Sequence, residues 1–278
     1  MSTVAPGPAP PSRLRAWLSP PAPAVEVIHD PRERRLVVVE VAVVLAVTLG
    51  LSALRSGLSL LDSVLSPIPL AEQRVALNAP GARAGLVDLA VQLTRGLQLV
   101  AWGALGAFLL VRGGVTLRSV GLDARRPGRD ALGAAGLAAL IGVPGLGLYL
   151  VARAAGVSAT VAPSTLADTW WELPVLVFSA AANSWAEEVV MVAYLLTRLR
   201  QLGWSENAAL WAQALLRGAY HLFQGLGGFV GNIVMGLVFG RLWQRTNRLW
   251  VLVGAHALID VVAFAGYALL AGRVSWLP

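Results

Sequence analysis

Seven apolar stretches recur along this 278-residue sequence, and each is long enough to cross a lipid bilayer as a helix. They occupy residues 36–54, 86–111, 131–152, 173–197, 206–224, 227–244 and 249–272. Charged residues make up only 13% of the chain, against about 25% in soluble domains, and its mean hydropathy is +0.67. We therefore expect an all-α fold, a polytopic bundle of about seven to eight transmembrane helices, and not a soluble enzyme.

The segment before the first apolar stretch has a different composition. Residues 1–35 are rich in Pro and Ala, carry five Arg and contain no apolar run, which predicts a flexible cytoplasmic tail. Residues 36–272 predict the transmembrane helical domain. Within it, residues 57–65 place leucines at helical spacing beside Ser and Asp, which indicates a short interfacial helix or a re-entrant segment.

Arginine supplies all 22 basic residues, and its distribution predicts the orientation of the bundle. With connections alternating between the two membrane faces, one face receives 15 Arg and the other five, while Arg95 and Arg217 fall inside predicted spans. Because basic loops stay on the inner side, the N-terminus is expected in the cytoplasm. The Arg residues lie between apolar runs and form no basic patch, so we expect a lipid bilayer and no nucleic acid as partner. A chain rich in Arg and free of Lys favours a multi-pass protein of a bacterial inner membrane.

Ionisable side chains interrupt three of the apolar stretches, although each costs about 2.5–3.5 kcal/mol near the bilayer centre. They are Glu187, Glu188, Arg217, His221, His256 and Asp260. Four residues separate Arg217 from His221, and His256 from Asp260, so each pair shares one helical face. Neighbouring residues on a helix diverge by about 100°, so we expect one of the two Glu to face water and the other to pair with Arg.

A carboxylate beside imidazole in a dry site can hold and deprotonate a water molecule. Glu187 or Glu188 would be the general base, while His221 and His256 orient the water, stabilise an oxyanion or carry a proton, which predicts amide hydrolysis. Glu187, His221 and His256 could equally bind one divalent metal such as zinc. Because the chain has no Cys, a metal site would have to use His and carboxylate ligands. The same groups would also serve as a relay in an ion- or proton-coupled transporter.

These residues resemble the motifs of the CPBP family, the CAAX proteases and bacteriocin-processing enzymes related to type II CAAX prenyl proteases. That family carries EExxxR, FxxxH and HxxxN or HxxxD on three helices, and residues 172–266 carry Glu187 with Glu188, His221, and His256 with Asp260 in that order. The resemblance implies an intramembrane endopeptidase acting on a membrane-associated protein or peptide. It implies that Glu187 activates water with the help of His221, and that His256 and Asp260 bind the oxyanion. Members have been described both with and without a metal, so the cofactor stays open: none or one divalent metal.

Two positions depart from the family pattern. Val192 stands where the first motif has Arg, and Arg217 stands where the second has Phe. We predict that Arg217 replaces the missing partner of Glu188 from the neighbouring helix, in a supporting role. The lost motif Arg also leaves open an inactive relative that acts as a scaffold or immunity protein.

Overall fold

A computed structural model describes residues 17–18, 26–166, 168–270 and 273. Most of the predicted N-terminal tail and the last two residues of the final predicted span lie outside the described residues. The helices are α2 (Pro31–Val47), α3 (Leu49–Leu65), α4 (Gly85–Arg112), α5 (Pro127–Ala154), α6 (Glu172–Glu187), α7 (Leu195–Gln201), α8 (Glu206–Ala219), α9 (Leu226–Thr246) and α10 (Leu249–Leu270). A π-helical segment, Glu188–Tyr194, joins α6 to α7, and short 3₁₀ turns lie at Leu70–Glu72 and Leu222–Gln224.

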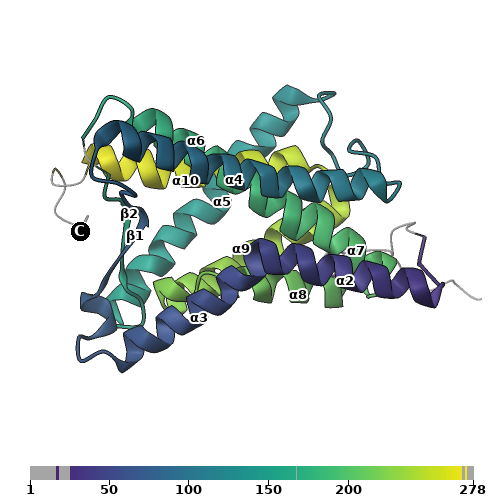
Figure 1. Cartoon of the computed structure of the whole chain (residues 1–278), viewed down its shortest axis with the longest axis horizontal. Coiled ribbons are helices and arrows are strands. Elements are labelled where there is room, and N and C mark those ends of the chain that lie inside the picture. Colours follow the sequence, from purple (N-terminus) through teal and green to yellow (C-terminus); the bar gives the residue numbers. More distant parts are fainter. Residues whose placement is uncertain (1–16, 19–25, 167, 271–272, 274–278) are drawn as a thin grey trace, which may run out of the picture.

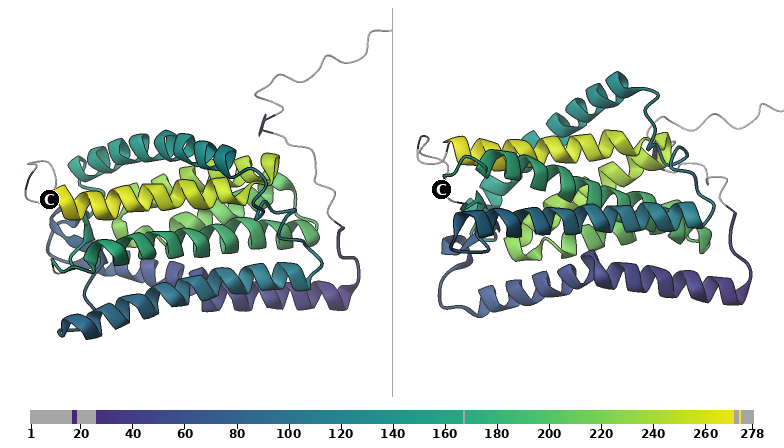
Figure 2. Two further views of the ribbon diagram at one scale, coloured as in Figure 1. Left: turned by 90° about the horizontal axis from the view of Figure 1, so that it is seen from above. Right: turned by 45° about the horizontal axis from the view of Figure 1, so that its top comes forward.

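Most of the helices run along one long axis of the molecule (Figure 1). On one side, α4 and α10 each pack against α6; on the other, α8 packs against α9 and α3. Helix α5 crosses behind and contacts both α9 and α10 (Figure 2). The two groups of helices meet around the π-helical segment, which contacts α4, α8, α9 and α10.

The expected all-α membrane bundle is confirmed. Among the described residues, five helical spans are long and apolar enough to cross a membrane, and six if the bent pair α2 and α3 counts as one. The expected span at 206–224 is instead the 14-residue helix α8, about 21 Å long, followed by a turn. The helix ends at Ala219 with Tyr220 as its C-cap, and a short 3₁₀ turn then leads to Gly225, whose positive φ of +92° precedes α9.

The segment expected as a separate helix at 57–65 belongs to α3, which continues α2 across a bend of 50°. The hydroxyl of Thr48 donates to the carbonyl oxygen of Val44 at 2.6 Å, four residues back. Such bonds compete with the helical backbone bonds and bend helices. Residues 57–65 are therefore not a separate short helix but the last part of α3, and the bent pair is either one broken span or a re-entrant segment.

A small parallel sheet, which the sequence did not predict, lies at the end of the bundle where α10 ends (Figure 1). It pairs β1 (Arg74–Asn78) with β2 (Thr160–Ser164). Arg74 ties the sheet to α10, because its guanidinium donates to the hydroxyl of Tyr267 at 2.5 Å. We call this end the sheet end and the opposite one, where α7 finishes, the α7 end.

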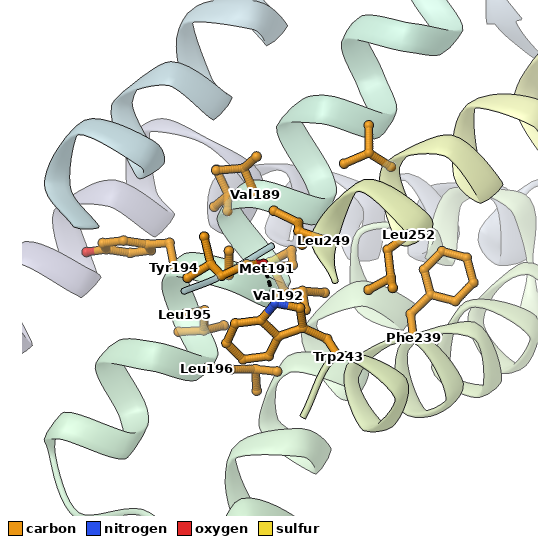
Figure 3. Close-up of a cluster of buried hydrophobic side chains, with 14 of the residues drawn as sticks. Val189, Met191, Val192, Tyr194, Leu195, Leu196, Phe239, Trp243, Leu249 and Leu252 are labelled. Carbon is orange, nitrogen blue, oxygen red and sulfur yellow. Dashed lines mark hydrogen bonds between the residues drawn. The ribbon is translucent and has the colours of Figure 1, made fainter. Parts of the chain in front are cut away.

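The largest apolar cluster surrounds the segment that follows Glu188 and leads into α7, and Figure 3 draws part of it. The six side chains that follow Glu188, from Val189 to Tyr194, are each 0% exposed. Helices α9 and α10 complete the cluster. We name the set the apolar plug: Val189, Val190, Met191, Val192, Ala193, Tyr194, Leu196, Phe239, Trp243, Leu249 and Leu252.

Candidate active site

Glu187 and Glu188 lie where α6 gives way to the π-helical segment. A π-helical turn inside a helix shifts the side chains that follow, and such turns are frequent at functional sites. The two carboxylates have different surroundings here, as expected for neighbours on a helix. Glu188 is completely buried, whereas the side chain of Glu187 keeps 5% of its surface exposed.

Glu188 joins three helices through one oxygen. Its Oε1 accepts a hydrogen bond from Arg217 Nη2 of α8 at 2.6 Å and lies 2.8 Å from His256 Nδ1 of α10. The ion pair that was predicted from the departures at positions 192 and 217 is therefore confirmed. Since both side chains of this pair are 0% exposed, their charges compensate each other away from solvent.

Glu187 faces the end of α8. Its Oε2 accepts a hydrogen bond from the hydroxyl of Tyr220 at 2.7 Å, and Arg217 Nη1 lies 4.0 Å from the same oxygen. Both carboxylates are buried, but among the described residues only Glu188 receives a hydrogen bond from Arg. The expected pairing of one Glu with Arg is thus present, and the orientation of the other toward water stays a prediction.

His221 follows α8 in the turn before α9, and its side chain is half-buried. Its Nδ1 lies 2.9 Å from the backbone carbonyl oxygen of Arg217. A carbonyl oxygen only accepts, so Nδ1 carries the proton and Nε2 is the nitrogen left for proton transfer. Its ring lies 4.6 Å, centroid to centroid, from that of Tyr220, whose hydroxyl donates to Glu187.

His256 and Asp260 extend the site along α10. The Nδ1 of His256 is engaged by Glu188, and its Nε2 lies 3.6 Å from Asp260 Oδ2, longer than a hydrogen bond. Asp260 Oδ2 accepts from the amide of Asn183 at 3.1 Å. Asp260 is therefore held by α6 while it faces the imidazole of α10.

The sequence reasoning missed two members of this cluster, Tyr220 and Asn183. Asn183 precedes Glu187 by four residues on one helix, so its helical spacing could have indicated a shared face. Tyr220 directly precedes His221, and no periodicity singles it out, because it lies in the turn where the helix ends.

The three side chains named as possible metal ligands, Glu187, His221 and His256, do not form a ligand set in this structure. Across the described part of the chain, no group of three or more His, Cys, Asp or Glu lies close enough together to hold a metal. One nitrogen of each imidazole is engaged elsewhere, by Glu188 and by the carbonyl oxygen of Arg217.

Arg217 carries more donors than it uses. Its Nε and Nη1 are buried and have no hydrogen-bond partner among the described residues, and the same holds for Glu188 Oε2. The guanidinium lies between two carboxylates, paired with Glu188 and 4.0 Å from Glu187, and keeps donors that are not used. The arrangement thus combines a carboxylate base, an imidazole with a free nitrogen and a fixed positive charge, which are groups that hydrolytic chemistry uses.

Comparison with known protein families gives a match over residues 169–262, to the family described as "Type II CAAX prenyl endopeptidase Rce1-like". The matched segment runs from just before α6 into α10 and contains every site residue discussed above. No curated protein and no solved structure matches the chain.

Proposed function

Because its segment 169–262 places the chain in the CAAX protease family, we propose that it is an intramembrane endopeptidase that hydrolyses peptide bonds with a water activated by Glu187. The observation that carries the proposal is that the two carboxylates have different hydrogen-bond partners. Glu188 is completely buried in ion pairs, while Glu187, also buried, has an oxygen, Oε1, with no hydrogen bond to the described residues.

In the proposed mechanism, Glu187 accepts a proton from water as the oxygen of that water attacks the carbonyl carbon of the substrate. The Tyr220 hydroxyl holds Oε2 and so fixes the direction of Oε1. Collapse of the tetrahedral intermediate breaks the C–N bond, and the departing nitrogen takes up the proton from Glu187 or through His221 Nε2. Glu188 would act as a positioning residue, which orients His256 and Arg217 from behind the site.

The oxyanion of the intermediate requires donors or positive charge. His256 and Asp260 would face it, with His256 providing Nε2–H when protonated, and Asp260 orienting the ring from 3.6 Å. Arg217 adds a fixed positive charge beside the reacting atoms.

The proposed substrate is a segment of a membrane-associated protein or peptide, and the proposed location is a bacterial inner membrane. The Arg-rich and Lys-free composition supports a bacterial origin. The membrane-spanning helices and the family support a multi-pass membrane protein that takes its substrate from the bilayer.

The test is cleavage of quenched-fluorescent peptides, with and without a prenylated C-terminal Cys, by the purified protein in detergent. We expect Glu187→Ala and His221→Ala each to lower kcat by about 10²–10⁴-fold, the contribution of a general base. Glu172→Gln is the matched control, because it neutralises a carboxylate on the same helix near the sheet end. Loss of activity with a chelator, restored by Zn²⁺, would indicate a metal.

Cleavage that survives both substitutions would refute the proposed roles. Proton- or ion-driven uptake by proteoliposomes, with no peptide cleaved, would favour the transporter alternative. Specific binding of a peptide without either activity would favour an inactive relative.

A further inference from the structure

One face of α6 is polar from the sheet end to the active site. Ser179, Asn183 and Glu187 follow one another at intervals of four residues, so their side chains share a face. Ser179 and Glu187 are separated by eight residues, or about 12 Å along the helix. We call these three residues the polar face of α6.

Each residue of the polar face forms a hydrogen bond with a polar side chain from another element. The Ser179 hydroxyl donates to Oδ1 of Asn78 in β1 at 3.1 Å, and Asn183 donates to Asp260. Glu187 accepts from Tyr220. The polar groups therefore form a series that starts at the sheet and ends at the proposed general base.

The polar face is also partly open. Ser179, Asn183 and Asp260 are half-buried, and the side chain of Asp260 is 16% exposed. Another face of α6 is apolar and exposed, with Leu173 at 38% and Val177 at 45%, as expected for contact with lipid. Polar side chains with exposed surface are costly against lipid, so in the membrane their open sides require water.

The opposite approach to Glu187 is blocked. The apolar plug occupies the α7 side of the site, and its residues at 189–194 are fully buried (Figure 3). Water crossing this region would lose its hydrogen bonds, because the plug offers it almost no polar partners. The two approaches to the site therefore differ in polarity.

From this asymmetry we infer that water reaches Glu187 from the sheet end, along the polar face of α6, and that the α7 end is dry. This inference rests on the proposed function only for the role of that water as the nucleophile in peptide hydrolysis. An extended peptide covers about 3.3 Å per residue, so about four residues of substrate span the distance between Ser179 and Glu187. A substrate entering the same way would present an extended segment of that length from the sheet end.

The inference assigns a membrane side to the reaction. The connections at the α7 end carry the Arg-rich segments, such as residues 112–129 and 241–248, and the sheet end is poor in Arg. Because basic loops stay in the cytoplasm, the sheet end, from which water enters, lies on the opposite side of the membrane. The proposed enzyme would then cut segments at the outer half of the bilayer.

Thiol labelling tests this directly, because the chain has no Cys and each introduced thiol is the only one present. Single variants Ser179→Cys and Asn183→Cys are treated in sealed vesicles with a sulfonated maleimide, which reacts with thiolates in water and does not cross membranes. Val177→Cys, exposed on the same helix, is the matched lipid-facing control. We expect the first two to react at least tenfold faster than the control.

Two exposed positions report which side the reagent reaches: Ala155→Cys for the sheet end and Ser119→Cys for the α7 end. Ser179→Cys should react only in vesicles whose Ala155→Cys also reacts. Labelling after unfolding in SDS gives the total thiol in each variant. Equal rates at 177, 179 and 183, or labelling of position 179 only from the Ser119 side, would overturn the inference.

These outcomes are independent of cleavage. If the labelling pattern holds and no peptide is cut, the water path stands and the proposed function fails. If Glu187-dependent cleavage is found while positions 179 and 183 stay unreactive, the enzyme stands and the path is wrong.

Discussion

The buried ion pair between Arg217 and Glu188 allows a quantitative prediction. Arg217→Met removes a charge-assisted hydrogen bond of 2.6 Å in which both side chains are 0% exposed. Glu188 then keeps only His256 as a partner, and Glu187 loses the guanidinium at 4.0 Å. Breaking a buried pair from one side leaves an uncompensated charge, so we expect the free energy of unfolding to fall by about 3–5 kcal/mol.

Glu188→Gln should cost a similar amount, because it leaves the guanidinium without its counter-charge. The double variant removes both charges and should cost no more than either single change, so the coupling energy should be at least about 3 kcal/mol. Unfolding by SDS in mixed micelles, followed by the fluorescence of the 10 Trp residues, measures all four proteins.

Arg200 and Glu206 provide the control, because they form another buried pair, with 6% and 8% side-chain exposure and a distance of 2.5 Å. This pair lies at the α7 end, so Arg200→Met should lower stability without a specific loss of kcat in the folded fraction. If the costs of Arg217→Met and Glu188→Gln simply add in the double variant, within about 0.5 kcal/mol, the two side chains are not coupled and the reasoning fails.

Two further predictions concern the scaffold. Gly103→Ala would place a Cβ 2.2 Å from Nε1 of Trp185, so we expect a loss of about 1–3 kcal/mol in unfolding free energy, whereas Gly136→Ala, with nothing within 4 Å, should cost nothing; equal effects would contradict the close packing of α4 on α6. In the α4–α5 connection, the backbone N–H of Arg125, with help from Arg248, lowers the pKa of Asp123 below its ordinary value. Because its pKa is lowered in the folded state, ionised Asp123 stabilises the fold at pH values above about 4, the ordinary pKa of Asp. This stabilisation is lost as the pH falls through the lowered pKa, so the difference in melting temperature between the wild type and Asp123→Asn should shrink toward pH 3. A difference independent of pH would exclude the charge as its cause.

Local sequence patterns determined the class of the protein. Apolar runs of about 20 residues and a low charge content predicted a helical membrane bundle, because the bilayer admits few other solutions. The four-residue spacing of His256 and Asp260 fixed their shared face within one helix. The pairing of Arg217 with Glu188 was also predictable, since two departures from the family motif are complementary.

Tertiary structure decided what depends on contacts between distant segments. Tyr220 meets Glu187 across 33 residues of sequence, and Asn183 meets Asp260 across 77, separations over which no periodicity carries information. Helix α8 ends at Ala219, and the turn that follows it reaches Gly225, whose positive φ accompanies a bridge to Ser158 that only the fold forms.

The polarity of the two approaches to the site was likewise invisible in the sequence. Residues on both sides of Glu187 read as one apolar stretch, 173–197. Packing alone distinguishes them, because the residues that follow Glu188 are enclosed by α4, α8, α9 and α10, whereas Ser179 and Asn183 remain partly open. The sequence determined that charge lies inside the membrane domain; the three-dimensional arrangement decided which carboxylate is paired with Arg217, because that depends on what the neighbouring helices place against it.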